Sequence, residues 1–179
     1  MSRAGSGGPH GMSDPAAPDL DQLARDVLDS VRYVVLGTTD EDGRTRTSPV
    51  YFTPYRYEDL YWVSHSDTHH SHNLARDDRL SGVVFDSTRP PPETSAVYVT
   101  GTAREIPADE VAEHVPRAFD PEGRGGRRFS PEELTDDDEL RLWVLHVDQW
   151  EVHVRGGHPT LGTGRDRRVP VDPRAGQGA

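Results

Sequence analysis

Four of the nine histidines of this chain fall within eight positions, in the stretch HSDTHHSH that begins at residue 65. An imidazole can bind a transition metal, transfer a proton near neutral pH, or donate a hydrogen bond to an anion. His65 and His69 are four residues apart, and His69 and His72 are three apart, so a continuous helix would place all three on one face. A metal site would need convergent ligands, and the stretch offers the carboxylate of Asp67 but no specific pattern such as HExxH.

The turn within this stretch favours an anion site. Ser64 ends a β-rich run, and Thr68 can cap a helix that begins at His69. The N-terminus of a helix presents free backbone N–H groups and the positive end of the helix dipole, which suit a phosphate. The hydroxyl groups of Ser64, Ser66 and Thr68 and the imidazoles of His69 and His70 would add donors. The alternative is a polar, partly exposed helix start in which the histidines have no special task.

The elements that must position these residues are a helix followed by a series of strands. Asp19 followed by Gln22 resembles a capping box, and apolar residues then recur at helical spacing, which predicts an amphipathic helix from Asp19 to Val31. Six segments rich in β-branched and aromatic residues predict strands. These segments are residues 33–39, 45–55, 60–66, 81–87, 96–106 and 142–154.

Local signals add detail to this sheet. Gly43 in the stretch DEDGR lies where a turn needs a positive φ angle, and Pro49 indicates a sheet edge or an irregularity. Residues 108–119 and 130–141 predict short helices. This order of elements predicts an α+β fold built on an antiparallel sheet or small barrel. His146 and His153 are an odd number of residues apart on the last strand, so we expect them on opposite faces of it.

Composition limits the class of protein. The 179 residues carry a net charge of -11, with 31 acidic against 20 basic side chains, so neither nucleic acid nor an anionic membrane surface is expected as a partner. The chain has no cysteine, and all its basic side chains are arginine, which excludes disulfides, thiol nucleophiles and a Schiff-base lysine. No apolar run is long enough to span a bilayer and none resembles a signal peptide, so we expect a cytoplasmic protein.

The chain divides into one predicted domain and two tails. Residues 1–18 are rich in Gly, Pro and Ser and predict a disordered N-terminal tail. Residues 156–179 are similarly loop-like and predict a flexible C-terminal tail. The remaining residues, 19–155, are enough for one ordinary domain.

The order of these pieces resembles the pyridoxamine 5'-phosphate oxidase-like, FMN-binding split-barrel superfamily. The resemblance covers about residues 20–106 and returns loosely in LWVLHVDQWEVH. The resemblance rests on three segments, which are VLGTTDEDGRTRTSPVYF, LYWVSHSDTHHSHNLARDDRLSGVVFD and AVYVTGTAREI. The resemblance implies an antiparallel six-stranded split β-barrel with flanking short helices. It also implies a homodimer, with FMN or in some branches a deazaflavin held between the two protomers.

The same resemblance implies a set of cofactor-binding residues. One segment would run beside the flavin ring, a second along the ribityl phosphate, and the helix start would hold the phosphate. In that order the residues are Arg46, Thr47, Ser48, Pro49 and Val50, then Val63, Ser64, His65 and Ser66, then Thr68, His69 and His70.

The helix start departs from the family's usual pattern. His69 and His70 stand where an Arg-Lys pair is common, and His72 stands where an arginine is often found. Histidine is mostly neutral above a pKa of about 6.5, whereas arginine and lysine stay charged. We therefore expect weaker phosphate binding, with an affinity for FMN that falls as the pH rises from about 6 to about 8.

The implied function is a flavin-dependent oxidoreductase that acts on a small molecule. The flavin would carry the redox chemistry, so no dedicated acid or base is required, and the sequence offers no convincing one. Oxidation of pyridoxamine phosphate itself would need a second phosphate site rich in Arg and Lys, which the sequence does not reveal. Two alternatives stay open: a non-enzymatic protein that binds or senses a deazaflavin, haem or another ligand, and a metal-binding protein that uses His65, His69 and His72.

Two further side chains have competing interpretations. Arg46 could meet the phosphate from the neighbouring strand, or it could be a solvent-facing arginine of a hairpin. Trp150 could stack on the flavin or on a dimer partner, but packing in the core is the usual role of a strand tryptophan.

Overall fold

The computed structural model describes residues 18–90, 95–119, 124, 126–135 and 139–175. The predicted N-terminal tail, residues 1–18, thus lies outside the described residues except for Pro18. In the described part of the chain, no helix is both long enough and apolar enough to cross a membrane. The elements are α1 (Leu20–Ser30), β1 (Tyr33–Thr39), β2 (Thr45–Tyr51), β3 (Thr53–Tyr55), β4 (Asp59–His65), α2 (His69–Arg76), β5 (Arg79–Phe85), β6 (Ala96–Glu105), α3 (Val111–Ala118), the 3₁₀ turn η1 (Glu132–Leu134), β7 (Leu140–Val154) and β8 (Arg167–Val171).

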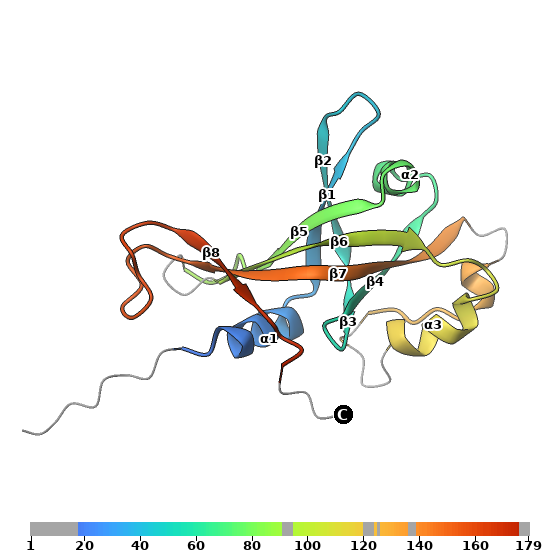
Figure 1. Ribbon diagram of the computed structural model, residues 1–179. Helices are drawn as coiled ribbons and strands as arrows, with labels where there is room; N and C mark the ends of the chain where they lie inside the picture. The colour runs from blue at the N-terminus through green and yellow to red at the C-terminus, as the bar shows by residue number, and fades with distance from the viewer. Residues whose placement is uncertain (1–17, 91–94, 120–123, 125, 136–138, 176–179) are drawn as a thin grey trace, which may run out of the picture.

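One antiparallel sheet forms the framework of the molecule (Figure 1). Its strand order is β2-β1-β5-β6-β7-β4-β3, and β8 pairs with β7 beyond this path. The sheet curls into a half barrel, with short helices at its faces and ends. The predicted α+β split-barrel class is therefore confirmed, although the described residues form eight strands where six were predicted.

The second predicted strand, residues 45–55, is divided in the structure. Phe52 is fully buried at the point of division, and β2 and β3 on either side of it lie at opposite ends of the strand order. A continuous run of β-forming residues does not reveal such a bend, because the bend follows from burial of one side chain. Pro49 lies in β2 at a sheet edge, as predicted, and Gly43 has a φ angle of 81° in the preceding turn.

The segment predicted as a flexible C-terminal tail contains the additional strand, β8. Residues 167–171 pair with residues 150–154 of β7. The guanidinium of Arg25 in α1 donates to the carbonyl oxygens of Pro173 and Ala175, at 3.1 and 3.0 Å. The prediction for residues 156–179 is thus wrong for residues 167–175, because backbone hydrogen bonds and a contact with α1 fix a segment that has few apolar residues.

Apolar side chains pack on both faces of the sheet. The main core lies on the face covered by α1, which contributes Ala24, Val27 and Leu28. A second cluster lies on the other face, where α3 and η1 cover β4 and β7. The side chain of Asp19 caps α1 by accepting from the backbone N–H groups of Asp21 and Gln22, both at 3.0 Å, as the sequence predicts.

A bulge in β7 changes the direction of its side chains. Gly101 of β6 pairs with Val147, and the preceding Thr100 pairs with Gln149, so Asp148 is an extra residue. An extra residue reverses the alternation of side chains along a strand. His146 and His153 consequently lie on the same face of β7, opposite the main core, and the prediction of opposite faces is wrong.

The turn between β3 and β4 has an unusual backbone. Arg56 and Tyr57 both have positive φ angles, 52° and 54°, in a turn that closes with a 3.1 Å hydrogen bond from the Glu58 N–H to the Tyr55 carbonyl. Residues other than glycine, asparagine and aspartate rarely adopt this backbone conformation. The buried indole of Trp150 holds the turn by donating to the Tyr57 carbonyl at 2.9 Å. Trp150 is therefore a core residue, as expected from its type.

Candidate functional site

The first predicted site segment, Arg46 to Val50, lies on β2. This strand pairs with β1 and ends the strand order, so its other edge carries no strand in the described chain. Arg46, Thr47 and Pro49 are exposed, whereas Val50 is buried. β2 also lies beside β4 and α2. The structure thus brings all three predicted segments together, next to an open sheet edge.

Arg46 is engaged within its own hairpin. Its Nε lies 2.5 Å from Oδ2 of Asp40, and Oδ1 of Asp40 accepts from the Asn73 side chain at 2.9 Å. The hydrogen bond from Arg46, followed by that from Asn73, holds the pKa of Asp40 below its usual value. An approaching phosphate would therefore compete with Asp40 for this guanidinium.

The second and third segments meet where β4 leads into α2. Thr68 caps the helix, as predicted, by accepting from the Ser71 N–H at 3.3 Å. The N–H groups of His69 and His70 occupy the first two helical positions, which have no partner within a helix. A phosphate oxygen at this end of α2 would meet open donors and the positive end of the helix dipole.

His70 is turned toward the interior. Its Nε2 lies 2.7 Å from the Ser64 hydroxyl and 3.1 Å from the Thr68 hydroxyl. The ring is buried, and burial lowers the pKa of His70, with the charge of His69 as a smaller cause. A neutral His70 holds β4 against the helix start and adds no positive charge there.

The other three histidines do not converge on one point. Nε2 of His65 lies 2.5 Å from a carboxylate oxygen of Glu139, and Nε2 of His72 lies 3.4 Å from one of Asp67. His69 is exposed and faces the groove that contains Asp40. Within the described residues, no group of three or more histidine, aspartate or glutamate side chains is arranged to hold a metal ion.

Burial of His70 predicts how stability depends on pH. Because its pKa is lower in the folded protein than the unfolded value of about 6.5, the unfolded chain binds more protons just below pH 6.5. The free energy of unfolding should therefore fall as the pH falls from about 7.5 to about 5.5. His70→Gln cannot titrate, and we expect a shallower slope in urea unfolding measured across this range. Burial also lowers the pKa of His114, which both proteins retain, so equal slopes would contradict the role of His70.

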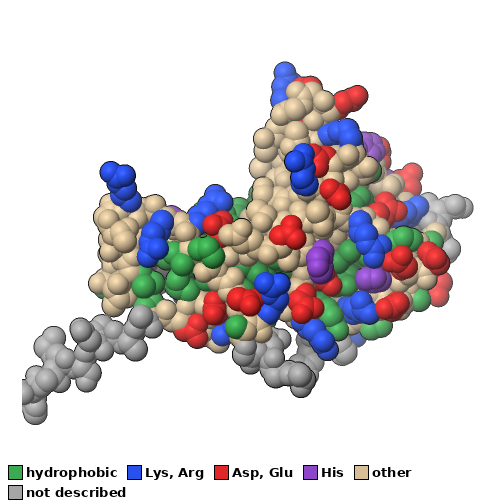
Figure 2. All heavy atoms as spheres, in the orientation of Figure 1, with side chains coloured by type: hydrophobic (Ala, Val, Ile, Leu, Met, Phe, Trp, Pro, Cys, Tyr) green, Lys and Arg blue, Asp and Glu red, His purple; other side chains and the backbone are tan. Residues whose placement is uncertain are grey.

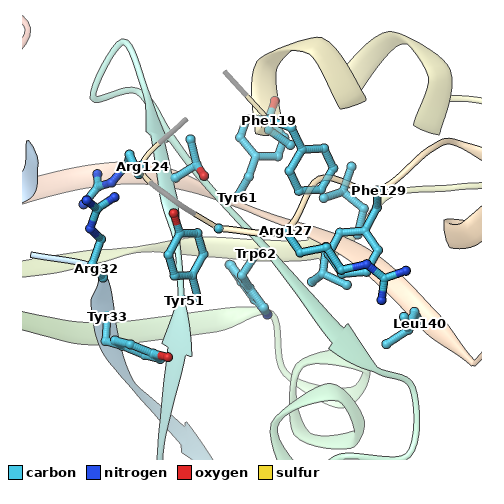
Figure 3. Close-up of a pocket in the computed structure, with 15 residues that line it drawn as sticks. Arg32, Tyr33, Tyr51, Tyr61, Trp62, Phe119, Arg124, Arg127, Phe129 and Leu140 are labelled. Atoms are coloured by element: carbon cyan, nitrogen blue, oxygen red, sulfur yellow. The ribbon is translucent and has the colours of Figure 1, made fainter. Parts of the chain in front are cut away.

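A cavity of about 680 Å³ opens between β2, β4 and the chain that follows α3 (Figure 3). Of its fifteen described lining residues, six are aromatic, three are arginines, and most of the others are aliphatic. The lining includes Arg32, Tyr51, Trp62, Phe119, Arg124 and Phe129. Pockets of this size and character bind small organic ligands.

The cavity adjoins the predicted flavin segments. Tyr51 directly follows Val50 on β2, and Val63 of β4 both lines the cavity and belongs to the predicted site. Tyr61 forms part of the wall, but its hydroxyl lies 2.9 Å from Nδ1 of His114 in α3. Burial raises the pKa of Tyr61 to about 12, so this hydroxyl is protonated and bonded away from the cavity.

The sequence analysis missed the arginines and aromatic residues of this cavity. The glycine-rich composition of residues 120–129 predicts only a flexible link, and residues 120–123 and 125 lie outside the described part. The missed signal was its composition, since three arginines lie between Phe119 and Phe129 in a strongly acidic chain. Elsewhere on the surface, acidic and basic side chains are interspersed over the face seen in Figure 2.

Comparison with known proteins places the fold in a family. A family model for pyridoxamine 5'-phosphate oxidase matches residues 20–153, most of the chain. The chain belongs to the pyridoxamine 5'-phosphate oxidase family. No curated protein sequence matches it. The resemblance inferred from the hairpin and the strand–helix–strand unit is thereby confirmed.

Solved structures support the same split-barrel fold of the pyridoxamine 5'-phosphate oxidase family. A haem-binding protein from Mycobacterium smegmatis has a TM-score of 0.62 at 20% identity, and the match covers 87% of this chain but 60% of that one. The haem storage protein HutZ from Vibrio cholerae has a TM-score of 0.57 at 18% identity, with 76% and 95% covered. General stress protein 26 from Bacillus anthracis has a TM-score of 0.51 at 13% identity, with 74% and 92% covered. Identities this low show the fold alone.

Proposed function

We propose that this chain is a flavoprotein that binds FMN where β2, β4 and α2 meet, and that it oxidises or reduces a small molecule. The observation that carries the proposal is the open edge of β2 beside the N-terminus of α2. A flat ring with donors and acceptors along its edge can pair with a strand edge, and a phosphate suits a helix start. The family, which is often flavin-binding, supports the same ligand.

Each segment has a task in this proposal. Residues 46–50 lie along the flavin ring, residues 63–66 follow the ribityl chain, and the N–H groups of His69 and His70 hold the phosphate with the Thr68 hydroxyl. Bound FMN supplies the exchange of electrons with the substrate. The protein binds the flavin, orients it and keeps water from it, and a second copy of the chain encloses the flavin beside the β2 edge in a homodimer. A deazaflavin phosphate would use the same residues.

Haem is the second candidate, since two of the similar structures are haem proteins. The cavity could receive a flat ring with its carboxylates at the arginines. Among its described lining residues, however, no histidine, cysteine or methionine is present to bind the iron, and tyrosine is the remaining ligand type. FMN needs no such ligand, and we therefore favour it.

The test of the FMN proposal adds one charge at the phosphate end. Aspartate and asparagine both cap helices well, but Thr68→Asp places a negative charge beside the phosphate and Thr68→Asn does not. We expect Thr68→Asp to weaken FMN binding by about tenfold or more relative to Thr68→Asn, because a like charge replaces a hydrogen-bond donor. Binding is measured by titration near pH 6.5, with riboflavin as the ligand that lacks the phosphate.

Riboflavin should bind both variants equally. FMN should bind the unchanged protein more tightly at pH 6 than at pH 8, because histidine side chains lose their charge over this range. A protein that binds haem but retains no FMN after gel filtration would contradict the proposal. Equal FMN affinity in the two Thr68 variants would show that the phosphate does not bind at the start of α2.

A further inference from the structure

The charges of the cavity differ from those of the rest of the chain. The protein has a net charge of -11, yet the described lining contains three arginines and no aspartate or glutamate. Arg127 is paired with Glu133. Arg32 and Arg124 lie close together at one end of the cavity (Figure 3), and neither forms an ion pair with any described residue. Two unpaired cations at one end of a cavity form a binding site for an anion.

A bound anion would stabilise Arg124 more than Arg32, because Arg124 is the more buried of the two. Its Nε and Nη1 are buried without a hydrogen-bond partner in the described chain, and its third nitrogen donates to the Val31 carbonyl. Burial lowers the pKa of Arg124, while Tyr51 and Asp29 act in the opposite direction. Asp29 accepts from the Tyr57 hydroxyl at 2.9 Å and does not line the cavity. The guanidinium carbon of Arg124 lies 4.8 Å from the centre of the Phe52 ring, so a cation–π contact offsets part of the cost of burial. A buried charge without an ion-pair partner is still costly, so the site gains from a bound anion.

The remaining wall indicates what carries the anion. Tyr51 and Trp62 lie on the strand side, and Phe119 and Phe129 lie on the opposite side. The chain approaches Tyr51 closely at Gly126, where a Cβ atom would lie 2.6 Å from the ring. Aromatic rings prefer to pack against aromatic rings, edge to face or offset. The cavity therefore combines a slot for a ring with a paired-arginine site for an acidic group.

We propose that this cavity binds an aromatic carboxylate, with the carboxylate at Arg32 and Arg124 and the ring between the aromatic side chains of the strand side and those of the opposite side. Arginine is suited to this group because a planar guanidinium can form two parallel hydrogen bonds with a carboxylate. That the ligand is the substrate rests on the proposed flavin function, since Tyr51 and Val63 adjoin the residues assigned to the flavin. Binding itself does not depend on that function.

The test compares a charged ligand with a neutral one of the same shape. Calorimetric titration with 2-naphthoate and with 2-naphthylmethanol is carried out on the full chain, with and without saturating FMN. We expect Arg124→Gln and Arg32→Gln each to weaken 2-naphthoate binding by about tenfold or more, the loss of a charge-assisted hydrogen bond. Neither variant should change the affinity for 2-naphthylmethanol.

A control variant and a second test variant distinguish loss of the anion site from loss of folding. Arg44→Gln removes an exposed arginine of the β1–β2 turn, which is paired with Asp42, and should leave both affinities unchanged. Arg32 lies at the exposed rim, so Arg32→Gln tests the anion site even if Arg124→Gln fails to fold.

Several results would overturn the proposal. They are no binding of 2-naphthoate at millimolar concentration, equal affinity for the neutral analogue, and displacement of 2-naphthoate by FMN, which would make the cavity the flavin site. Binding of 2-naphthoate by a protein that never binds FMN would instead contradict the flavin function and support the carboxylate site. A protein that binds FMN but does not bind 2-naphthoate would support the flavin function and contradict the carboxylate site.

Discussion

Gly101→Ala is expected to lower the free energy of unfolding by about 3 kcal/mol, because the site has no room for one methyl group. A Cβ atom at residue 101 would lie 2.0 Å from the His146 carbonyl oxygen and 3.0 Å from Cδ1 of Leu145. The nearer atom belongs to the backbone of β7, so no rotation of a side chain can relieve the overlap. Either the pairing of β6 with β7 opens at the bulge or the two strands move apart.

The matched control for this change is Gly157→Ala. Nothing lies within 4 Å of a Cβ atom at residue 157, and its φ angle is outside the positive region. Urea unfolding should show a difference within about 0.5 kcal/mol for this variant. If Gly101→Ala were equally mild, the bulge at Asp148 would be adaptable, and it could not fix the direction of the side chains along β7.

The sequence predicted elements that depend on neighbouring residues. The Asp19 and Thr68 caps and the turn at Gly43 all follow from interactions within a few residues. The bulge at Asp148 and the strand β8 depend on partners far along the chain. Asp148 is extra only relative to β6, and β8 forms because β7 extends to meet it. The local pattern of residue types does not predict partners that are distant in the chain.

The candidate site shows the same division. The three segments named from the sequence do meet, because the curl of the sheet brings β2 against β4 and the Thr68 cap starts α2 beside them. The direction of each ring was not predictable: His70 points inward to Ser64, and His65 pairs with Glu139, some seventy residues later in the chain. The cavity escaped prediction because its second wall comes from the chain after α3, which carries no periodic pattern.

Trp150→Ala is expected to lower the free energy of unfolding by about 4 kcal/mol, close to the upper range for a core aromatic. The indole is fully buried in the main core, and its Nε1 donates to the Tyr57 carbonyl at 2.9 Å. That hydrogen bond holds the turn in which Arg56 and Tyr57 have positive φ angles. Left-handed backbone costs about 1–2 kcal/mol per residue outside glycine, so this turn depends on its anchor.

Trp143 provides a matched comparison for the hydrogen bond itself. It is almost as buried as Trp150 and stacks on Trp62 at 6.1 Å, but its Nε1 has no hydrogen-bond partner in the described chain. Trp143→Phe should therefore lower the free energy of unfolding by about 1 kcal/mol, because only packing is lost. Trp150→Phe should lower it by about 2 kcal/mol, because the Tyr57 carbonyl also loses its hydrogen-bond donor. Thermal and urea unfolding of the two variants measure this difference.

The Trp150 variants should also change ligand binding, since the turn leads directly into β4, which carries Trp62 and Val63. A turn released from Trp150 leaves the start of β4 free to shift against β2. Affinity for 2-naphthoate should then fall in Trp150→Phe and stay near its original value in Arg56→Gly, which relieves the backbone strain at residue 56 but keeps the anchor. Equal stability of Trp150→Phe and Trp143→Phe would show that packing alone holds this turn.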